Sequence, residues 1–141
     1  MSLKKLLAAA TAATLCACGG GKKASSAAKN QPERLIFGRG GGVSGAVEEK
    51  VFVSSGQYFA IRRFGASKAD TLSKRTFDSK TVAPLFEEYR QKLASLKHEQ
   101  TGNVYKYIEY EKSGAKHRIS WTDPGPEAAR ALYDKALKLI Q

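Results

Sequence analysis

The sequence predicts an α+β fold, in which a small antiparallel sheet of about five to six strands, in the order ββββ-α-ββ-α, is covered by two amphipathic helices. Four short β-patterned runs precede the first helical pattern, and two more precede the second. Each helical pattern carries one apolar stripe, for which an antiparallel sheet with one apolar face is the natural partner. Residues 33–141 are enough for a single domain with one modest core.

Alternating polar and apolar residues mark the strands. In the second run, Val47, Val51 and Val53 fall on one face and Glu48 and Lys50 on the other, which is the period of two expected for a half-buried strand. The glycines that follow the first run are expected to break its strand early. The strands are expected at residues 34–37, 43–53, 58–64, 72–77, 104–111 and 115–121.

The helices are expected at residues 81–97 and from Pro126 to near the C-terminus. Pro84 is compatible with a helix only within the first turn, which places the first helix start near Thr81. Pro126 suits the first position of the second helix, and Trp121 is expected in the core. The two apolar stripes consist of Val82, Leu85, Phe86, Tyr89, Leu93 and Leu96, and of Ala129, Leu132, Tyr133, Ala136, Leu137 and Ile140.

Residues 1–32 have a different composition. Lys4 and Lys5 precede about ten apolar or small residues, the length of a signal-peptide core and too short to span a bilayer. The following Leu15-Cys16-Ala17-Cys18 resembles the lipobox of bacterial lipoproteins. That resemblance implies removal of residues 1–17 and lipidation of Cys18 by a diacylglyceryl group and an acyl chain such as palmitate. Residues 18–32 hold no large apolar side chain, so we expect a flexible tether.

The net charge of the chain and the positions of its cysteines limit the kinds of ligand that the domain is expected to bind. The chain carries 24 Lys and Arg against 13 Asp and Glu, a formal charge of +11, which loss of Lys4 and Lys5 lowers by two. A basic balance favours anionic glycans, lipids or membrane surfaces, although a solvated surface explains it equally well. Nucleic acid is not expected as a partner of an envelope protein. Both cysteines, Cys16 and Cys18, lie in the leader region, so the domain has no thiol for a disulfide or a metal.

A glycine-rich segment at residues 38–45 follows the first β-patterned run. It lacks the third glycine of a dinucleotide-binding fingerprint, and the residues after it are β-patterned where a helix is required. Three interpretations stay open: an anion-binding nest, a loop that lies flat against a partner, and a wide strand connection. The candidate binding residues in it are Arg39, Gly40, Gly41 and Gly42.

Basic and aromatic residues alternate elsewhere in the chain. Arg62 and Arg63 are further candidate binding residues, because arginine grips phosphates and stacks on sugars. The alternative is an exposed sheet face whose charges discourage aggregation. Tyr105 and Tyr107 suit either a binding face or a set of cross-strand core pairs.

Catalytic motifs are scarce. His98 and His117 are the two histidines, and neither has zinc-ligand spacing. The segment at residues 42–46 fails the Gly-x-Ser-x-Gly pattern at its last position. We therefore expect no enzyme, no metal site and no cofactor.

Two motifs carry a family likeness. Residues 37–45, and residues 119–124 late in the chain, resemble motifs of a group of small, uncharacterised bacterial lipoproteins, which have Phe-Gly-x-Gly-Gly-Gly early and Trp-Gly-Asp-Pro late. Val43 and Thr122 depart from that pattern. The resemblance implies a shared fold and a location in the cell envelope, and nothing about chemistry.

Together these features predict a lipid-anchored, non-enzymatic envelope protein that binds another protein or an envelope component. The outer membrane is preferred, because Gly19 stands where inner-membrane lipoproteins of some bacteria carry Asp. Two alternatives stay open, namely a protease inhibitor displayed on a lipid tether and a carrier of an anionic lipid or glycan.

Overall fold

The structure is a computed structural model that describes residues 31–141. It contains one six-stranded antiparallel sheet and two helices, and the predicted element order ββββ-α-ββ-α is confirmed. The expected leader at residues 1–17, Cys18 and most of the expected tether lie outside the described residues. Within residues 31–141, no helix is long and apolar enough to cross a membrane.

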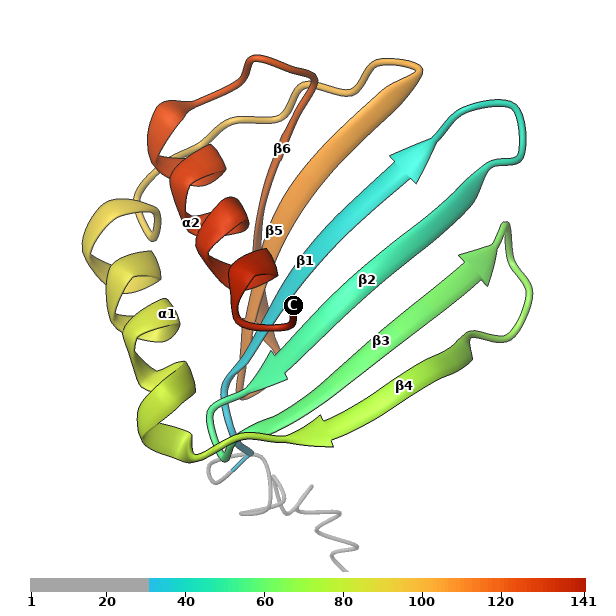
Figure 1. Cartoon of the computed structure of the whole chain (residues 1–141). Coiled ribbons are helices and arrows are strands. Elements are labelled where there is room, and N and C mark those ends of the chain that lie inside the picture. The colour runs from blue at the N-terminus through green and yellow to red at the C-terminus, as the bar shows by residue number, and fades with distance from the viewer. Residues whose placement is uncertain (1–30) are drawn as a thin grey trace, which may run out of the picture.

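The first strand in the sequence lies inside the sheet. The spatial order is β4-β3-β2-β1-β5-β6, so the chain meanders outward from β1 to β4 and then returns through α1 to the other side of β1 (Figure 1). The elements are β1 (Arg34–Gly41), β2 (Ala46–Val53), β3 (Gln57–Phe64), β4 (Asp70–Thr76), α1 (Ser79–Lys92), β5 (Val104–Lys112), β6 (Ala115–Trp121) and α2 (Glu127–Lys138).

The expected break of the first strand after Phe37 is wrong. Strand β1 continues to Gly41, and Gly38 pairs with Glu49 of β2 on one side and with Tyr107 of β5 on the other. A strand with a partner on both sides has its ladder hydrogen bonds satisfied, which offsets the weak strand propensity of glycine. The second strand accordingly starts at Ala46, three residues later than expected.

The first helix is shifted toward the N-terminus relative to the prediction. The side chain of Asp78 accepts a hydrogen bond from the backbone N–H of Lys80 at 2.8 Å, so the helix begins at Ser79 and Pro84 lies beyond its first turn. The helix ends at Lys92 instead of continuing to 97. The chain after it pairs with the edge of β6, because Ser120 N–H donates to the carbonyl of His98 and Gln100 N–H to that of Ser120, both at 2.9 Å.

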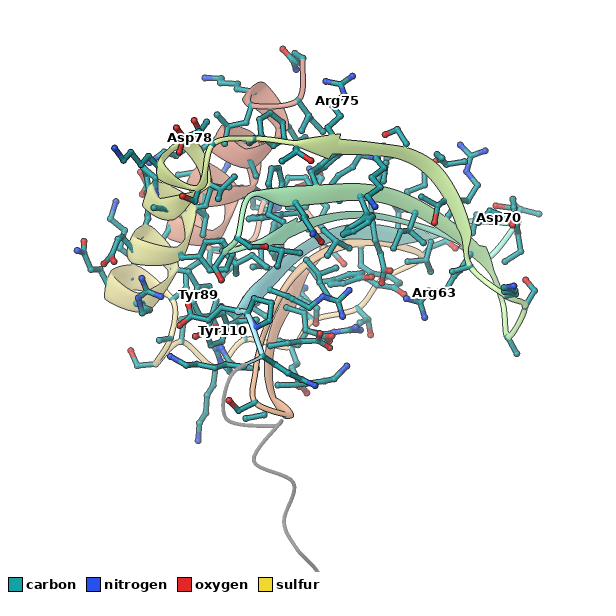
Figure 2. The ribbon with its side chains drawn as sticks, turned by 90° about the horizontal axis from the view of Figure 1, so that it is seen from below. Arg63, Asp70, Arg75, Asp78, Tyr89 and Tyr110 are labelled. Atoms are coloured by element: carbon teal, nitrogen blue, oxygen red, sulfur yellow. The ribbon has the colours of Figure 1, made fainter. Side chains whose placement is uncertain are left out.

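The main core is formed by helix and strand residues together. Tyr133 of α2 contacts Phe37 of β1 edge to face at 6.0 Å between ring centroids, and Trp121 of β6 at 5.8 Å. Tyr89 of α1 stacks on Tyr110 of β5 at 4.8 Å (Figure 2). Trp121 is fully buried, as predicted. The largest fully buried side chains are Trp121, Tyr89, Tyr107, Phe37, Phe52, Phe86, Leu35, Leu85, Leu93, Ile108, Ile119 and Leu132.

A second, smaller cluster consists of strand residues alone. Ile36, Val51 and Tyr107 are buried in it, and Val47 and Phe59 pack against it. Since successive strand residues point to opposite faces, this cluster lies on the face of the sheet opposite to Leu35, Phe37 and Phe52, which belong to the main core. The alternation predicted for the second strand is therefore present, and its valines lie on the face of the smaller cluster.

Candidate functional site

The glycines of β1 make room for two tyrosine rings. A Cβ atom added to Gly38 would lie 2.0 Å from Cζ of Tyr107, and one added to Gly40 would lie 2.8 Å from Cζ of Tyr105. The two rings are stacked, with centroids 6.2 Å apart and planes inclined by 30°. At these two positions the missing side chains are thus replaced by rings from the neighbouring strand.

Gly41 and Gly42 begin the turn between β1 and β2. Their φ angles are +98° and +79°, in the left-handed region that favours glycine. The N–H of Gly42 donates to the carbonyl of Asn103 at 2.6 Å, and a Cβ at Gly41 would lie 2.0 Å from that same oxygen. These glycines bring the turn close to the start of β5.

Arg39 and Arg62 lie near Glu48 on the face of the sheet that carries the main core. Arg62 holds the Glu48 carboxylate through Nε at 3.1 Å and Nη2 at 2.5 Å. This hydrogen bonding, despite an opposing effect of burial, lowers the pKa of Glu48, and the charge of Arg39 contributes. Arg39 itself is exposed and forms no ion pair with any residue between 31 and 141. Arg62 and Arg63 are successive residues of β3, so their side chains point to opposite faces of the sheet.

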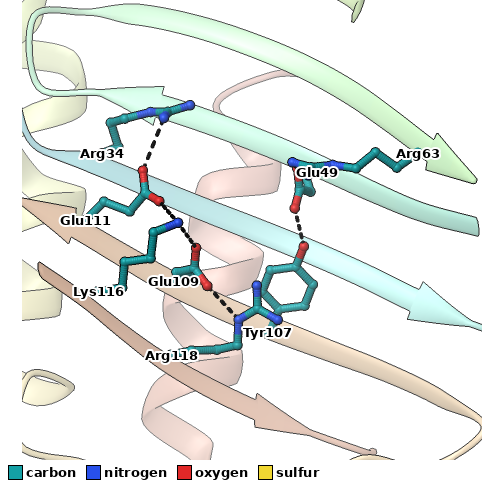
Figure 3. A network of polar contacts seen from close by, with 8 residues as sticks. All are labelled: Arg34, Glu49, Arg63, Tyr107, Glu109, Glu111, Lys116 and Arg118. Atoms are coloured by element: carbon teal, nitrogen blue, oxygen red, sulfur yellow. Dashed lines mark hydrogen bonds and ion pairs between the residues drawn. The ribbon is translucent and has the colours of Figure 1, made fainter. Parts of the chain in front are cut away.

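Arg63 belongs to a polar network on the face of the smaller cluster (Figure 3). It donates to Glu49 at 2.8 Å, and the Tyr107 hydroxyl donates to the other oxygen of that carboxylate at 2.5 Å. Burial and the bond to Glu49 raise the pKa of Tyr107, so its phenol stays protonated. The guanidinium of Arg118 lies over the Tyr107 ring, 4.2 Å from its centroid. The network is completed by Arg34, Glu109, Glu111 and Lys116.

This network occupies the face of the sheet that carries the smaller cluster, and its central side chains are buried there. Glu49 is 6 % exposed and Glu109 is 8 % exposed, and both carboxylates are held by arginine. The Tyr107 ring, which the sequence offered as part of a binding face, is 2 % exposed. A partner would therefore meet ion pairs on this face instead of an aromatic platform.

Three exposed apolar side chains lie at one end of the sheet, and Leu72 of β4 is exposed as well. Val43, in the turn between β1 and β2, is fully exposed, while Phe64 is 49 % and Val104 is 42 % exposed. The ladder places them at the same end, because Phe64 pairs with Ala46 just beyond that turn and Val104 pairs with Gly41 just before it. Phe64 of β3 and Val104 of β5 are three strand spacings, about 14 Å, apart, with the turn that carries Val43 between them. We call Val43, Phe64 and Val104 the distal rim, because β1 runs toward it from the start of the described chain (Figure 1).

Two adjoining hollows open beside the distal rim and share Arg39 and Val104. The first has a volume of about 260 Å³ and brings three of the predicted residues, Arg39, Gly40 and Gly41, together with Glu48. The second, of about 130 Å³, lies between the ends of β1, β5 and β6. It is lined by Arg39, Val104, Tyr105, Lys106, Trp121 and Asp123.

Sequence reasoning missed Lys106 and Asp123. Lys106 donates to both Asp123 oxygens at 3.0 Å, and it is the ladder partner of both Arg39 and Trp121. Lys106 and Asp123 lie far from Arg39 in the sequence. The pairing of β1 with β5 is what brings them beside it. The one local signal in the sequence is Asp-Pro-Gly-Pro at residues 123–126, which marks the end of the last strand and so places Asp123 at that end.

His117 has structural surroundings, whereas the buried Nε2 of His98 has no hydrogen-bond partner among the described residues. His117 lies between Tyr89 of α1, whose hydroxyl contacts Nδ1, and the carbonyl of Leu96, which is 3.0 Å from Nε2. Burial raises the pKa of Tyr89 to about 12, so its phenol is protonated and serves as the donor to that nitrogen. Within residues 31–141, no group of three His, Cys, Asp or Glu side chains is placed to hold a metal ion.

Comparison with known proteins gives no family assignment. No protein-family model matches the chain, and no curated protein matches it. The likeness of residues 37–45 and 119–124 to small lipoproteins therefore stays a prediction.

Proposed function

We propose that this protein is a lipid-anchored, non-enzymatic component of the bacterial cell envelope that binds a protein partner through the distal rim. The observation that carries the proposal is the gathering of Val43, Phe64 and Val104 at one end of the sheet. Exposed apolar side chains concentrated on one part of a surface are typical of protein interaction sites. The anchor itself rests on the lipobox and Cys18 of the sequence.

The backbone of the rim suits a close approach by a partner. A Cβ atom added to Gly42 or Gly45 would meet nothing within 4 Å, so the outer side of the turn is open. Arg39 beside the rim adds a cation without an ion pair among the described residues, and arginine at the border of an apolar patch is frequent in interfaces.

The arrangement of the domain agrees with this assignment. In our proposal α1 and α2 cover one face of the sheet, as they are drawn in Figure 1. The ion pairs of the polar network around Glu49 and Glu109 occupy the other face. The rim then remains as the free end. Because β1 leads from the tether toward the rim, a domain anchored at Cys18 presents the rim away from its point of attachment, on the outer membrane in our proposal.

The proposal is tested by site-specific photocrosslinking in cells. A photoreactive residue at Val43 is expected to give one discrete crosslinked protein, whereas the same residue at Ser55, in the exposed turn at the opposite end of the sheet, gives none. Equal products at both positions, or none at Val43, would contradict the rim as the docking site.

The anchor is tested separately by metabolic labelling with an alkyne fatty acid. We expect the parent chain to be labelled and to fractionate with the outer membrane, and the Cys18→Ser variant to lose both properties. A labelled Cys18→Ser variant would overturn the assignment of the lipidated residue, while leaving the crosslinking result at Val43 to be judged on its own.

A further inference from the structure

We infer that the face of the sheet that carries the smaller cluster docks on the surface of an anionic phospholipid bilayer. Strand alternation and ladder pairing place five cations on this face, which we call the cationic face: Arg34, Arg63, Lys74, Lys116 and Arg118. The inference rests on the lipid anchor of the proposed function, which keeps the domain near a bilayer, and it leaves the distal rim free for a protein partner.

Cations form the outermost charged layer of the cationic face. The side chains of the four cations in Figure 3 are 43–62 % exposed, whereas those of the three carboxylates in the same network are 8–16 % exposed. No other Asp or Glu of the described strands points to this face. A partner that approaches the face therefore meets positive charge, and the acids lie beneath it.

The cations keep donors for a further anion. Arg63 holds Glu49 through Nη2 at 2.8 Å, and Arg118 holds Glu109 through Nε at 2.7 Å. Because a guanidinium carries N–H groups on all of its nitrogens, it can bind a phosphate while it holds a carboxylate. Lys74 forms no ion pair with any residue between 31 and 141, and its ammonium lies 5.5 Å from the centroid of the Phe59 ring.

The spread of the cations fits a surface with many anions and not a single small anion. Lys74 and Arg118 are the two ends of one row of ladder partners that crosses the whole sheet, from β4 to β6. Neighbouring strands lie about 4.8 Å apart, so the backbones of these two residues are about 24 Å apart. Along the strands, Arg34 lies about 20 Å from Gly40, which is at the level of Arg63. Phosphates repeated over a bilayer surface match this spread.

The middle of the cationic face is apolar. Val47, Phe59, Ile61 and Tyr105 pack against the smaller cluster and are half-buried, so part of each side chain stays exposed. Binding at a membrane surface grows with the apolar area that is covered and with the attraction of cations to anionic lipids. Aromatic side chains are favoured at the boundary between membrane and water. The face therefore supplies both contributions.

Charge and chain connection favour a bilayer over a second copy of this chain. Two cationic faces would bring like charges together, which opposes association. In our proposal residues 18–32 join the lipidated Cys18 to the start of β1, where Arg34 belongs to the cationic face. A flexible chain of this length has a root-mean-square span of about 20 Å. The anchor thus holds the face within reach of the head groups, at a high effective concentration.

The test places a fluorophore on the cationic face of the full chain. The Thr71→Cys variant, exposed on this face beside Ile61, is labelled with nitrobenzoxadiazole and reconstituted into vesicles. Gln91→Cys, exposed on α1, is the matched control, and the parent chain, labelled in parallel, gives the signal of Cys16 and Cys18. We expect stronger, blue-shifted emission from position 71 in vesicles that contain phosphatidylglycerol. Pure phosphatidylcholine vesicles and position 91 give no change, and high salt reverses the effect.

Two charge variants complete the test. Lys74→Gln is expected to lower the ratio of docked to free domain about fivefold, as a contribution of about 1 kcal/mol per cation near an anionic surface implies. Lys138→Gln, which removes one exposed cation of α2, leaves the ratio unchanged. No response at position 71, equal responses at positions 71 and 91, or a Lys74→Gln variant that docks like the parent would each overturn the inference.

Further controls separate this inference from the proposed function. A response at position 71 to soluble dextran sulfate but to no vesicle would overturn the bilayer as the partner in favour of an anionic polymer. A chain that does not float with phosphatidylcholine vesicles contradicts the anchor, while the response of position 71 to phosphatidylglycerol still decides the docking. Crosslinking at Val43 is unaffected by any of these outcomes.

Discussion

At the residue scale, Tyr107 connects three strands through one side chain. Its ring fills the space over Gly38 of β1, its hydroxyl donates to Glu49 of β2, and Arg118 of β6 lies against its outer face. A buried carboxylate is tolerated only where donors surround it, and here Tyr107 and Arg63 are those donors. Tyr107 is thus a structural residue, although its sequence pattern also suited a binding face.

Removing the Tyr107 hydroxyl is expected to destabilise the protein. Tyr107→Phe leaves one oxygen of the buried Glu49 without its donor, which costs about 1–3 kcal/mol of unfolding free energy. Tyr105→Phe is the matched control, because the hydroxyl of that neighbouring tyrosine makes no hydrogen bond with the described residues and its loss is expected to cost less than about 0.5 kcal/mol. Urea unfolding of both variants measures the difference, and equal costs would contradict the role given to Glu49.

Adding a single methyl group at Gly38 is expected to displace the same ring. Gly38→Ala places Cβ 2.0 Å from Cζ of Tyr107, and overpacking of this kind costs about 1–3 kcal/mol. The cost is expected to fall sharply in a Tyr107→Ala background, where no ring is present. A double-mutant cycle by urea unfolding measures this coupling. Additive effects would show that Gly38 is needed for its backbone alone.

At the element scale, a carboxylate links the two helices. Glu88 of α1 accepts from Lys92 at 3.0 Å within its own helix and from Lys135 of α2 at 2.7 Å. The hydrogen bond from Lys135, and then the one from Lys92, lower the pKa of Glu88 below its usual value of 4.5. A carboxyl group with a lowered folded-state pKa stabilises the fold above its unfolded pKa, and the contribution disappears as the pH falls through the folded value.

The parent is therefore expected to be more stable than Glu88→Gln at pH 7, and the difference is expected to shrink as the pH falls below the usual carboxyl pKa of 4.5 and through the lowered folded value. The magnitude is at most about 1 kcal/mol, because both lysines are half-exposed and water screens the pair. Unfolding free energies of both proteins between pH 3 and 7 measure it. A difference that stays constant over this pH range would assign the effect to packing and not to charge.

Element boundaries show where local sequence suffices and where it does not. The hairpin around Ser113-Gly114 is correctly predicted, because positive φ at both turn residues is a local property. The end of α1 at Lys92 is not, since the following residues leave the helix to pair with Ser120, far downstream. The continuation of β1 through its glycines is missed for the same reason, because Tyr105 and Tyr107 complete that strand from another part of the chain.

At the scale of the whole molecule, the sheet joins all elements into one unit. Strand β1 pairs with β5 along its full length and with β2 from Arg34 to Gly40, and both helices contribute side chains to the main core. The fold class and the element order follow from hydrophobic periodicity. The candidate site follows only in part, since Arg39, Gly40 and Gly41 share a hollow with Glu48, whereas Lys106 and Asp123 depend on the sheet order.

We expect the domain to unfold in a single cooperative transition. Far-ultraviolet circular dichroism reports on all elements, and Trp121 fluorescence reports on the buried end of β6, so their urea midpoints are expected to coincide. Deletion of residues 1–32 is expected to shift that midpoint by an amount equivalent to less than about 0.5 kcal/mol. Separate transitions for the two probes would mean that the β1–β4 meander and the rest of the chain fold independently.

The central place of β1 has a consequence for biogenesis. A ribosome releases this strand first among the elements of the domain, yet one of its two edges waits for β5, which follows β2, β3, β4 and α1. Until then the nascent chain presents the unpaired backbone edge of a largely apolar strand. Such an edge is a template on which chains aggregate. A fragment that stops before Val104 would carry that edge permanently, and holding it apart from other chains until synthesis is complete is a task for a chaperone.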